Sequence, residues 1–496
     1  MSYFMGIDLG TSSTKTLIMD ENGKTAGIGN ASYGIQIPQI SYAEQDPLEW
    51  WEAVKKSIKK ALQEAGIQGR DIAGIGFSGQ MHGMVALDEN KQLACKAIIH
   101  LDQRSSLELK EIRTLAGNLM TEELLNQPSA GMMISSLYWL KKHQKETYDR
   151  IRYVMSPKDY ISFRLCGEIG TEYTDAGAAL GFSVKNYRWC TELFKRLELK
   201  EEIWPPVHKS FEIAGNVTAE AAEETGLSTS TKVIYGAGDS MAALTGNGII
   251  ESGFITCNIG TSSQLAVVVD KPIFDPKMRI QTWCHTVPKR WVVQSGTLNG
   301  GSVLSWLRNN MLKTDETFAQ LDQEAGLTPA GADGLYFLPY LAGERTPYND
   351  PYAKGVFFGL SMMHQQGHLV RSAMEGILFN LKECLYILDE MKVDRSRLIA
   401  SGGAARGVTW KQIQADVLNM PVYSTNVKEE ACQGAAILAA VGVGFFKDIK
   451  EGCQAAVTMS PEVVEPILEN VKIYNEKQEV FHDLYYSVKK LYPRIV

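Results

Sequence analysis

The sequence predicts a mixed α/β protein made of two similar domains, and three observations lead to this prediction. The chain has 496 residues, the usual length of two large domains. The tetrapeptide Gly-Thr-Ser-Ser occurs at residues 10–13 and again at residues 260–263, about half a chain later. In both halves, segments with the alternating pattern of strands are followed by segments with the periodicity of helices.

The first half begins with a predicted hairpin, which a helix follows. Residues 5–19 alternate apolar and polar side chains around the first Gly-Thr-Ser-Ser turn, a pattern typical of two paired strands. Residues 46–66 predict a helix, because an Asp cap and a Pro precede apolar residues at helical spacing and a Gly ends the segment. Residues 72–93 then predict a strand, a glycine-rich turn, a second strand and a hairpin turn.

The second half repeats this organisation and ends in helices. Its predicted elements are a strand and turn at 254–269, a hairpin around 288–290, a helix from about 301, and apolar helices at 367–390 and 410–418. We place the domain boundary near residues 245–248. This prediction divides the chain into an N-terminal domain at 1–246 and a C-terminal domain at 247–496.

Composition and charge argue against several classes of protein. Hydrophobic residues make up 45% of the chain and charged residues 22%, which is typical of a globular protein. The net charge of −7 gives no reason to expect a nucleic acid or an anionic membrane as partner. The N-terminus has no basic region before a long apolar core, and the longest apolar run, at 435–446, is shorter than the roughly 18–20 residues that cross a bilayer. We therefore expect a cytoplasmic protein, with this run as a buried helix.

The eight cysteines lack the spacing of zinc or redox pairs, so reduced thiols are expected.

The repeated Gly-Thr-Ser-Ser turn is a candidate phosphate site. Turns of this kind expose several backbone N–H groups and hydroxyls in a small arc, and such nests bind phosphate oxygens. Asp8 and Lys15 flank the first copy, where a carboxylate suits a phosphate-bound Mg²⁺ and the lysine adds a cation. The second copy has Asn258 and Leu265 in their places, so we expect the metal on the first copy alone. An ordinary β-turn is the alternative, and the duplication at half-chain spacing argues against it.

Other nucleotide-binding signatures are absent or misplaced. The P-loop pattern GxxxxGK[ST] does not occur. Gly74, Gly76 and Gly79 form a GxGxxG, but a turn and a strand follow it, whereas the dinucleotide fingerprint must open a helix. The turn at 401–407 is a better candidate for close approach by a flat ligand, because Gly402 and Gly403 have no side chains to block it.

Taken together, a series of motifs resembles the FGGY family of carbohydrate kinases over nearly the whole chain. These motifs are "GIDLGTSSTK", "AEQDPLEWW", "GFSGQMHG", "SPKDY", "GAGDS", "NIGTSS", "GERTPYNDPYAKGVFFGL" and "SGGAARGVTWKQIQADVLNMPV". The resemblance implies two duplicated RNase-H-like domains of the actin and hexokinase type, with a cleft between them. It also implies transfer of a phosphoryl group from MgATP to a sugar.

Within the family, "GQMHG", "AEQDPLEWW" and "LPYLAGERTP" are most similar to the xylulokinases, which phosphorylate D-xylulose on its 5-hydroxyl. By this resemblance, Asp239 in "GAGDS" is the general base that accepts the proton of the sugar hydroxyl. A carboxylate in the right geometry suffices, because phosphoryl transfer depends mainly on positioning and charge stabilisation. An Asp that only hydrogen-bonds its own turn is the alternative.

The resemblance also assigns the ligand contacts. Met81 and His82 would contact the sugar, with Asp102 and Arg104 completing the wall. Asp8 would hold Mg²⁺, directly or through water. The polyphosphate would be bound from both sides, by Gly10, Thr11, Ser12, Ser13 and Lys15 on one side and by Gly260, Thr261 and Ser262 on the other. The nucleotide would be lined by Gly301, Ser305, Gly402, Gly403 and Gly407. Helix packing and helix caps are the alternative explanation for the last set.

The sequence departs from the xylulokinase pattern near the sugar. His100 and Leu101 stand where an aromatic and an Asn are usual before Asp102, and Ser240 stands where an Asn follows the base. Loss of one oriented hydrogen bond is worth about 1–3 kcal/mol, enough to change which sugar is preferred. The prediction is therefore a D-xylulose kinase, with a kinase for another ketose such as ribulose, a polyol or a sugar acid as the first alternative.

Two alternatives lie outside sugar phosphorylation. An actin-like ATPase without a sugar substrate is disfavoured by "GQMHG" and "GAGDS", and a catalytically idle sugar sensor is disfavoured by intact Asp8, Lys15 and Asp239. The predicted partners are a small sugar and MgATP, with no nucleic acid and no membrane. A homodimer is left open.

Overall fold

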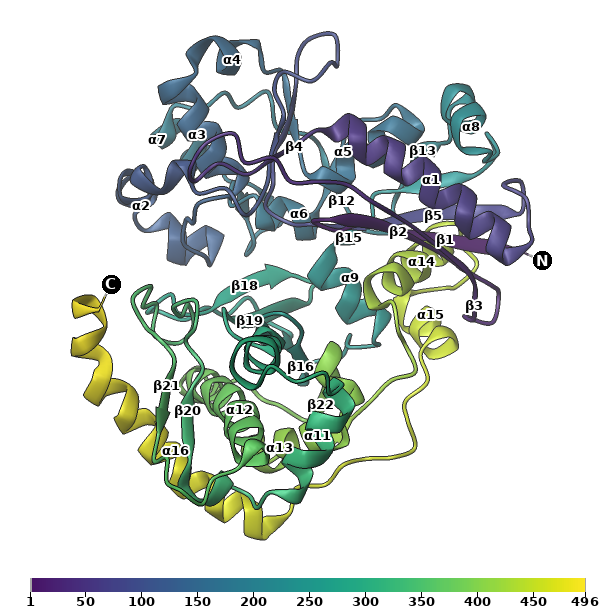
Figure 1. The fold of residues 1–496 in the computed structure, drawn as a ribbon. Helices are drawn as coiled ribbons and strands as arrows, with labels where there is room; N and C mark the ends of the chain where they lie inside the picture. Colours follow the sequence, from purple (N-terminus) through teal and green to yellow (C-terminus); the bar gives the residue numbers. More distant parts are fainter. Residues whose placement is uncertain (1, 496) are drawn as a thin grey trace.

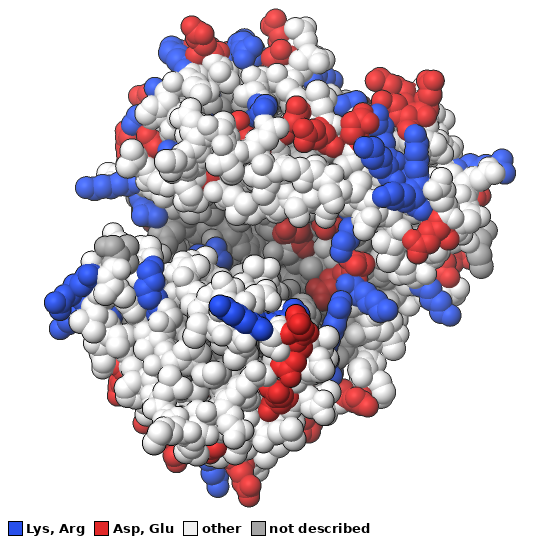
Figure 2. Space-filling model, viewed as in Figure 1, with Lys and Arg blue, Asp and Glu red and all other residues white. Residues whose placement is uncertain are grey.

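The computed structural model describes residues 2–495, which form two lobes that face each other across a groove (Figures 1 and 2). Each lobe is built on one mixed β-sheet with helices packed against it. The groove between the lobes is hollowed in the space-filling view, and charged side chains of both signs lie at one of its ends.

The N-terminal sheet has the strand order β13-β14-β5-β1-β2-β3, with β15 also paired to β5. The strands are β1 (Tyr3–Leu9), β2 (Ser13–Met19), β3 (Thr25–Ser32), β5 (Ile72–Gly79), β13 (Ile213–Asn216), β14 (Lys232–Ile234) and β15 (Ala237–Gly238). Strands β1, β2 and β3 are antiparallel neighbours, whereas β5 runs parallel to β1 and β14 runs parallel to β5.

The C-terminal sheet has the order β18-β19-β17-β16-β22-β23. Its strands are β16 (Phe254–Ile259), β17 (Ser263–Val269), β18 (Gln281–Cys284), β19 (Trp291–Thr297), β22 (Arg397–Ser401) and β23 (Val422–Tyr423). Here β16, β17 and β19 are antiparallel neighbours, while β22 is parallel to β16 and β23 is parallel to β22. Because both sheets share this five-strand pattern, the duplication predicted from the repeated turn is confirmed.

The helices cover the sheets and form the outer parts of both lobes (Figure 1). In the N-terminal half they are α1 (Pro47–Ala65), α2 (Leu109–Ala116), α3 (Met133–His143), α4 (Lys145–Arg150), α5 (Pro157–Cys166), α6 (Tyr173–Ala178), α7 (Thr191–Leu197), α8 (Ala219–Thr225) and α9 (Asp239–Gly246). In the C-terminal half they are α10 (Gly301–Trp306), α11 (Phe318–Leu327), α12 (Gln366–Glu390), α13 (Val408–Leu418), α14 (Glu430–Gly442), α15 (Ile449–Ala456) and α16 (Leu468–Val488).

Helix α1 illustrates how local sequence sets an element. The Asp46 side chain accepts a hydrogen bond from the backbone N–H of Leu48 at 2.9 Å, and Pro47 occupies the first helical position. Gly66 ends the helix in the left-handed conformation, at φ 67°. The predicted helix at 46–66 is therefore confirmed.

Helix α14 comes from the C-terminal half of the sequence but packs against the N-terminal sheet, beside α9 (Figure 1). A Cβ at Gly6 would lie 1.9 Å from the carbonyl oxygen of Cys432, and one at Gly76 would lie 2.1 Å from that of Ala435. These glycines therefore let the helix approach the strands closely, which explains Gly76, the central glycine of the GxGxxG, without a nucleotide. The helix ends at Gly442, so the apolar run at 435–446 is helical only in its first part.

Two further expectations concern the whole chain. The eight cysteines carry free thiols, and all but Cys95 are buried. Among the helices of residues 2–495, none combines the length and the apolar character needed to span a bilayer.

Candidate active site

The first Gly-Thr-Ser-Ser turn joins β1 to β2 at the edge of the groove. Asp8, near the end of β1, pairs with Lys15 across the hairpin and with Ser78 on β5. The Ser78 hydroxyl donates to Asp8 Oδ1 at 2.7 Å, while Lys15 Nζ lies 2.6 Å from Glu429 Oε2. Burial raises the pKa of Asp8, and the Ser78 hydrogen bond and Lys15 oppose this rise.

The second turn has a different register from the first. Asn258, the counterpart of Asp8, pairs with Gln264 across its hairpin and with Ser401 on the parallel strand. The expected match of Lys15 with Leu265 is therefore wrong. The second hairpin is one residue shorter, since the backbone N–H of Gly260 donates to the carbonyl of Ser262, whereas that of Gly10 donates to Ser13. Gln264 takes the place of Lys15, so a charged pair in one lobe corresponds to a neutral amide pair in the other.

Both turns are held by neighbouring residues. In the first, the hydroxyl of Tyr33 donates to the carbonyl of Gly10 and Gln45 Nε2 donates to the carbonyl of Thr11 at 2.7 Å. In the second, the N–H groups of Gly301 and Ser302 donate to the carbonyls of Gly260 and Thr261 at 2.6 and 3.2 Å. In each of these bonds a carbonyl oxygen of the turn is the acceptor. The bonds therefore hold the turns in place without using the N–H groups of the turn residues.

Asp239 is the first residue of α9, directly after strand β15. Its Oδ1 accepts a 2.6 Å hydrogen bond from the backbone N–H of Ser240, as expected of a carboxylate at a helix N-terminus. Burial, followed by the charge of Asp8, raises the pKa of Asp239 to about 7. The carboxylate at the start of α9 therefore lies near enough to Asp8, on β1, for the charge of Asp8 to act on it.

The donors around Asp8 fit a phosphate-bound Mg²⁺ better than a metal held by protein alone. Among residues 2–495, no group of three or more His, Cys, Asp or Glu side chains is placed to hold a metal ion. Mg²⁺ usually keeps several waters and binds one or two carboxylates together with substrate phosphates. The carboxylate of Asp8, with Asp239 near enough for the charge of Asp8 to raise its pKa, fits this kind of site.

Met81 lies beside Asp239, and His82 follows Met81 in the chain. A Cβ at Gly238 would lie 2.7 Å from Met81 Cγ, so Met81 packs directly against the residue before Asp239. His82 Nδ1 lies 2.9 Å from the carbonyl of Ala178, and its ring centroid lies 5.5 Å from that of Trp283 on the other lobe. Burial lowers the pKa of His82 to about 4, so the ring is neutral. Because Nδ1–H donates to the carbonyl of Ala178, Nε2 of the neutral ring is left to accept a hydrogen bond.

His100 also belongs to this end of the groove. Its charge would act on His82, and burial lowers its pKa. His100 Nδ1 is buried and has no hydrogen-bond partner among the described residues. A buried polar atom of this kind is costly unless a ligand or water satisfies it.

The polar groups of Asp102 and Arg104 bind other groups of the protein instead of being free to bind a ligand in the groove. Arg104 Nη2 lies 2.6 Å from Glu44 and 2.8 Å from Asp102, whose Oδ2 also accepts from the backbone of Ala43 at 2.7 Å. The guanidinium lies 3.8 Å from the ring centroid of Tyr42. Asp102 is fully buried, so the pair fits a structural role better than the predicted sugar contact.

A cavity of about 670 Å³ opens in the C-terminal lobe next to the second turn. Its lining includes six of the residues predicted for the nucleotide, namely Gly260, Thr261, Gly301, Ser305, Gly403 and Gly407. Gly402 lies next to it, where a φ of 73° and an Ile259 carbonyl 2.7 Å from a Cβ require glycine. Leu304, Phe318 and Trp410 add apolar walls that the sequence did not indicate. The size and the mixed lining suit an adenosine.

A cluster of buried charged residues adjoins the strand end before Asp239, and the sequence did not indicate it. Lys158, in "SPKDY", is fully buried and lies 2.6 Å from Asp159, 3.3 Å from Asp175 and 3.5 Å from Glu172. Glu172 accepts from the Thr174 hydroxyl, which in turn accepts from the backbone N–H of Gly238 at 2.8 Å. The cluster therefore fixes the strand end from which Asp239 projects.

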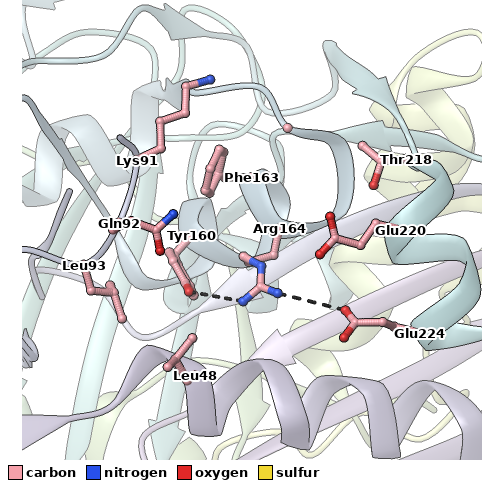
Figure 3. Close-up of a pocket in the computed structure, with 11 residues that line it drawn as sticks. Leu48, Lys91, Gln92, Leu93, Tyr160, Phe163, Arg164, Thr218, Glu220 and Glu224 are labelled. Atoms are coloured by element: carbon pink, nitrogen blue, oxygen red, sulfur yellow. Dashed lines mark hydrogen bonds and ion pairs between the residues drawn. The ribbon is translucent and has the colours of Figure 1, made fainter. Parts of the chain in front are cut away.

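A second cavity, of about 640 Å³, lies away from these residues among α1, α5 and α8 (Figure 3). Arg164 occupies its centre, where Nη1 lies 3.4 Å from the Tyr160 hydroxyl and Nη2 lies 4.0 Å from Glu224. None of the predicted site residues lines this cavity. The groove between the lobes is therefore the better candidate.

Known families, sequences and structures resemble this chain over nearly its whole length. Residues 3–246 match the N-terminal domain of the FGGY family of carbohydrate kinases, and residues 255–443 match its C-terminal domain. A xylulose kinase from Staphylococcus epidermidis is 34% identical over 98% of this chain and 97% of its own. The structure is similar to a ligand-bound xylulose kinase from Lactobacillus acidophilus, with TM-score 0.93 and 28% identity over the whole of both chains. A gluconate kinase from the same organism is similar at TM-score 0.92 and 28% identity, again over both whole chains.

Proposed function

The chain belongs to the FGGY family of carbohydrate kinases, and we propose that within this family it phosphorylates a ketopentose, D-xylulose, on its 5-hydroxyl. Members of the family use ATP as phosphate donor. The observation that carries the proposal is the position of Asp239, a half-buried carboxylate between the first phosphate turn and the wall of Met81 and His82. The similarity to xylulose kinases over the whole chain supports this choice of sugar.

We propose that Asp239 takes the proton of the sugar hydroxyl while that oxygen attacks the γ-phosphorus. The bond from the γ-phosphorus to the bridging oxygen breaks, so ADP leaves and the proton stays on Asp239. Met81 and the neutral His82 hold the sugar against the carboxylate. Asp8 and the phosphates would hold Mg²⁺, which when bound neutralises charge on the phosphates.

The two turns serve as opposing phosphate grips, through Thr11 to Ser13 with Lys15 on one lobe and through Thr261 and Ser262 on the other, while the N–H groups of Gly10 and Gly260 close the two hairpins. We also propose the domain boundary between residues 246 and 247. The family match to the N-terminal domain ends at 246 and supports this position.

A panel of acceptors tests the proposal. ADP release would be measured with D-xylulose, D-ribulose, a keto-hexose, a polyol and D-gluconate, and the acceptors compared by kcat/KM. We expect D-xylulose to be preferred. Because a similar structure is that of a gluconate kinase, a higher kcat/KM for D-gluconate would replace the ketose by a sugar acid. ADP release of equal rate without any sugar would overturn the kinase proposal itself.

The pH dependence follows from the pKa of Asp239, which burial and Asp8 raise to about 7. Only the ionised carboxylate can accept a proton, so activity is present above this pKa and lost below it. We expect kcat/KM for ATP to fall about tenfold for each pH unit below 7 and to be flat just above it. A kcat/KM that does not change between pH 5 and pH 8 would contradict the role of Asp239.

The nucleotide cavity can be tested with Gly403→Val. A Cβ at Gly403 would meet only the Ile259 carbonyl at 3.8 Å, an ordinary contact, so the variant should fold while its side chain reduces the cavity. We expect the KM for ATP to rise about tenfold, equivalent to about 1.4 kcal/mol of binding free energy, with the KM for sugar unchanged. Gly301→Val is the contrasting variant, because its Cβ would lie 2.7 Å from the Gly260 carbonyl and should also lower the thermal midpoint. An unchanged KM for ATP in Gly403→Val would place the nucleotide elsewhere.

A further inference from the structure

The cavity among α1, α5 and α8 contains an arginine whose N–H groups have few acceptors in the protein (Figure 3). The side chain of Arg164 is 23% exposed and lies at the centre of the cavity. Its Nη1 donates to the Tyr160 hydroxyl at 3.4 Å, and within residues 2–495 the guanidinium makes no other hydrogen bond. Because a guanidinium has five N–H donors in a planar fork, most of them are free to bind a ligand.

Glu224 is the nearest carboxylate to Arg164, but its oxygen atoms have closer partners. Arg164 Nη2 lies 4.0 Å from Glu224 Oε2, which is beyond hydrogen-bond distance. Trp51 Nε1 donates to Oε2 at 2.7 Å, and Lys55 Nζ lies 3.1 Å from Oε1. The Arg164 guanidinium lies over the ring of Trp51, with Cζ 4.9 Å from the ring centroid. An aromatic ring therefore holds the guanidinium in place, while its hydrogen-bond donors stay available to another anion.

Two other charged side chains line the cavity without a partner. Lys91 lies in the turn after β6 (Val85–Leu87), and Glu220 lies in the first turn of α8. Neither side chain forms an ion pair or a hydrogen bond with another residue in the described part of the chain, 2–495. The cavity thus presents two cations, Arg164 and Lys91, and one carboxylate, none of which has a close partner of opposite charge. A ligand with two negative charges and some hydrogen-bond donors matches this set.

The other walls of the cavity suit the carbon atoms and oxygen atoms of such a ligand. Tyr160 is buried, and its hydroxyl hydrogen has no acceptor among residues 2–495, so this hydroxyl is a further donor beside Arg164. Phe163, Leu48 and Leu93 add apolar surface around the charged groups (Figure 3). The volume of about 640 Å³ lies in the range of small-molecule sites and has room for a phosphorylated sugar.

The cavity is separate from the groove, although helix α5 reaches both. Arg164 lies near the end of α5, and Lys158, whose buried cluster fixes the strand end before Asp239, lies at its start. None of the residues predicted for the sugar or the nucleotide lines the cavity. A ligand in the cavity therefore leaves the groove free, and the two sites can be measured independently.

From these contacts we infer that the cavity is a second binding site, which takes a small phosphorylated polyol. The phosphate accepts hydrogen bonds from Arg164, Lys91 and the Tyr160 hydroxyl, and Glu220 accepts hydrogen bonds from hydroxyl groups of the ligand. A zwitterionic amino acid would pair with Arg164 and Glu220 but would leave Lys91 without a partner. The sugar phosphate that we propose as product of the groove belongs to this class of ligand. Its use as a probe rests on the proposed function, whereas the site itself does not.

Isothermal titration calorimetry on the full chain tests the inference. The protein would be saturated with Mg²⁺ and a non-hydrolysable ATP analogue, whose γ-phosphate takes the place of a product phosphate in the groove. D-xylulose 5-phosphate, D-ribulose 5-phosphate and 6-phosphogluconate would then be titrated, with inorganic phosphate and glycine for comparison. We expect a sugar phosphate to bind at one site per chain.

Variants locate this binding in the cavity. We expect Arg164→Gln to raise the Kd of the sugar phosphate about tenfold or more, because a charge-assisted hydrogen bond is lost. Lys91→Gln should raise it about threefold, and since this side chain is exposed and unpaired the variant keeps the test valid if Arg164→Gln does not fold. Arg188→Gln is the matched control, because Arg188 is 57% exposed, pairs with Glu123 and does not line the cavity. Its Kd should not change.

Three results would overturn the inference. The first is that no sugar phosphate binds to the analogue-saturated protein, and the second is a Kd that neither Arg164→Gln nor Lys91→Gln changes. The third is inorganic phosphate or glycine binding as tightly as the sugar phosphates, because the hydroxyl groups would then contribute nothing. Preference for an acceptor other than D-xylulose in the kinase assay would refute the proposed function alone, since the titration uses sugar phosphates of three kinds.

Discussion

Replacement of Asp239 by Asn is expected to lower kcat about 10³-fold while ATP still binds. Asn has the size of Asp and can still accept the hydrogen bond from the N–H of Ser240, so the start of α9 should be preserved. It cannot take a proton from the sugar hydroxyl, and general-base catalysis contributes about 10²–10⁴-fold. Loss of a negative charge facing Asp8 should, if anything, favour the binding of anionic phosphates.

The measurement is single-turnover phosphoryl transfer, with nucleotide Kd determined in parallel. Ser240→Ala is the control variant, since it removes a hydroxyl 3.4 Å from Asp239 Oδ1 but leaves the carboxylate in place. We expect its kcat to fall less than tenfold. More than a tenth of wild-type kcat in Asp239→Asn would show that another group, or water, accepts the proton.

The largest expected effect on stability comes from Lys158→Met. The side chain of Lys158 is fully buried among Asp159, Glu172 and Asp175, and Nζ also donates to the carbonyl of Tyr235 at 3.1 Å. Without the ammonium group, three buried carboxylates would repel one another with no cation among them. Removal of one partner from a buried ionic group costs about 3–5 kcal/mol, so the N-terminal lobe should unfold at a clearly lower temperature.

Thermal unfolding followed by circular dichroism would measure this effect. Lys145→Met is the matched control, because Lys145 pairs with Asp149 on the surface and its side chain is 77% exposed. Its midpoint should not change. The double variant Lys158→Met/Asp175→Asn should recover part of the loss, because it also removes one of the uncompensated charges. An unchanged midpoint in Lys158→Met would mean that the carboxylates are protonated or solvated in the folded protein.

The two-lobe fold could be predicted because a duplication leaves a local record in the sequence. The repeated tetrapeptide and the period-two strands around it indicated both sheets, and the caps of α1 indicated its ends. The register of the second hairpin could not be predicted in this way. The two tetrapeptides are identical, yet the second loop is one residue shorter than the first. As a result Gln264, and not Leu265, lies opposite Asn258.

The candidate site was predicted where motifs were contiguous and missed where it depended on distant contacts. Asp8, Asp239 and His82 stand in short motifs, and the structure brings them to one groove. Arg104 lies 60 residues from its partner Glu44 in the sequence, and Lys158 lies 77 residues from Tyr235, whose carbonyl it contacts. Such contacts depend on how the elements pack, which composition and spacing do not encode.

The packing of α14 against the N-terminal sheet makes the two halves of the chain interlocked rather than merely adjacent. A fragment that stops at residue 246 would lack the helix against which Gly6 and Gly76 pack, and would expose that face of its sheet. The complementary fragment would carry an apolar helix with nothing to cover it. Expressed as two separate polypeptides, the halves should therefore behave as a split protein, each poorly folded alone and recovering activity by reassembly.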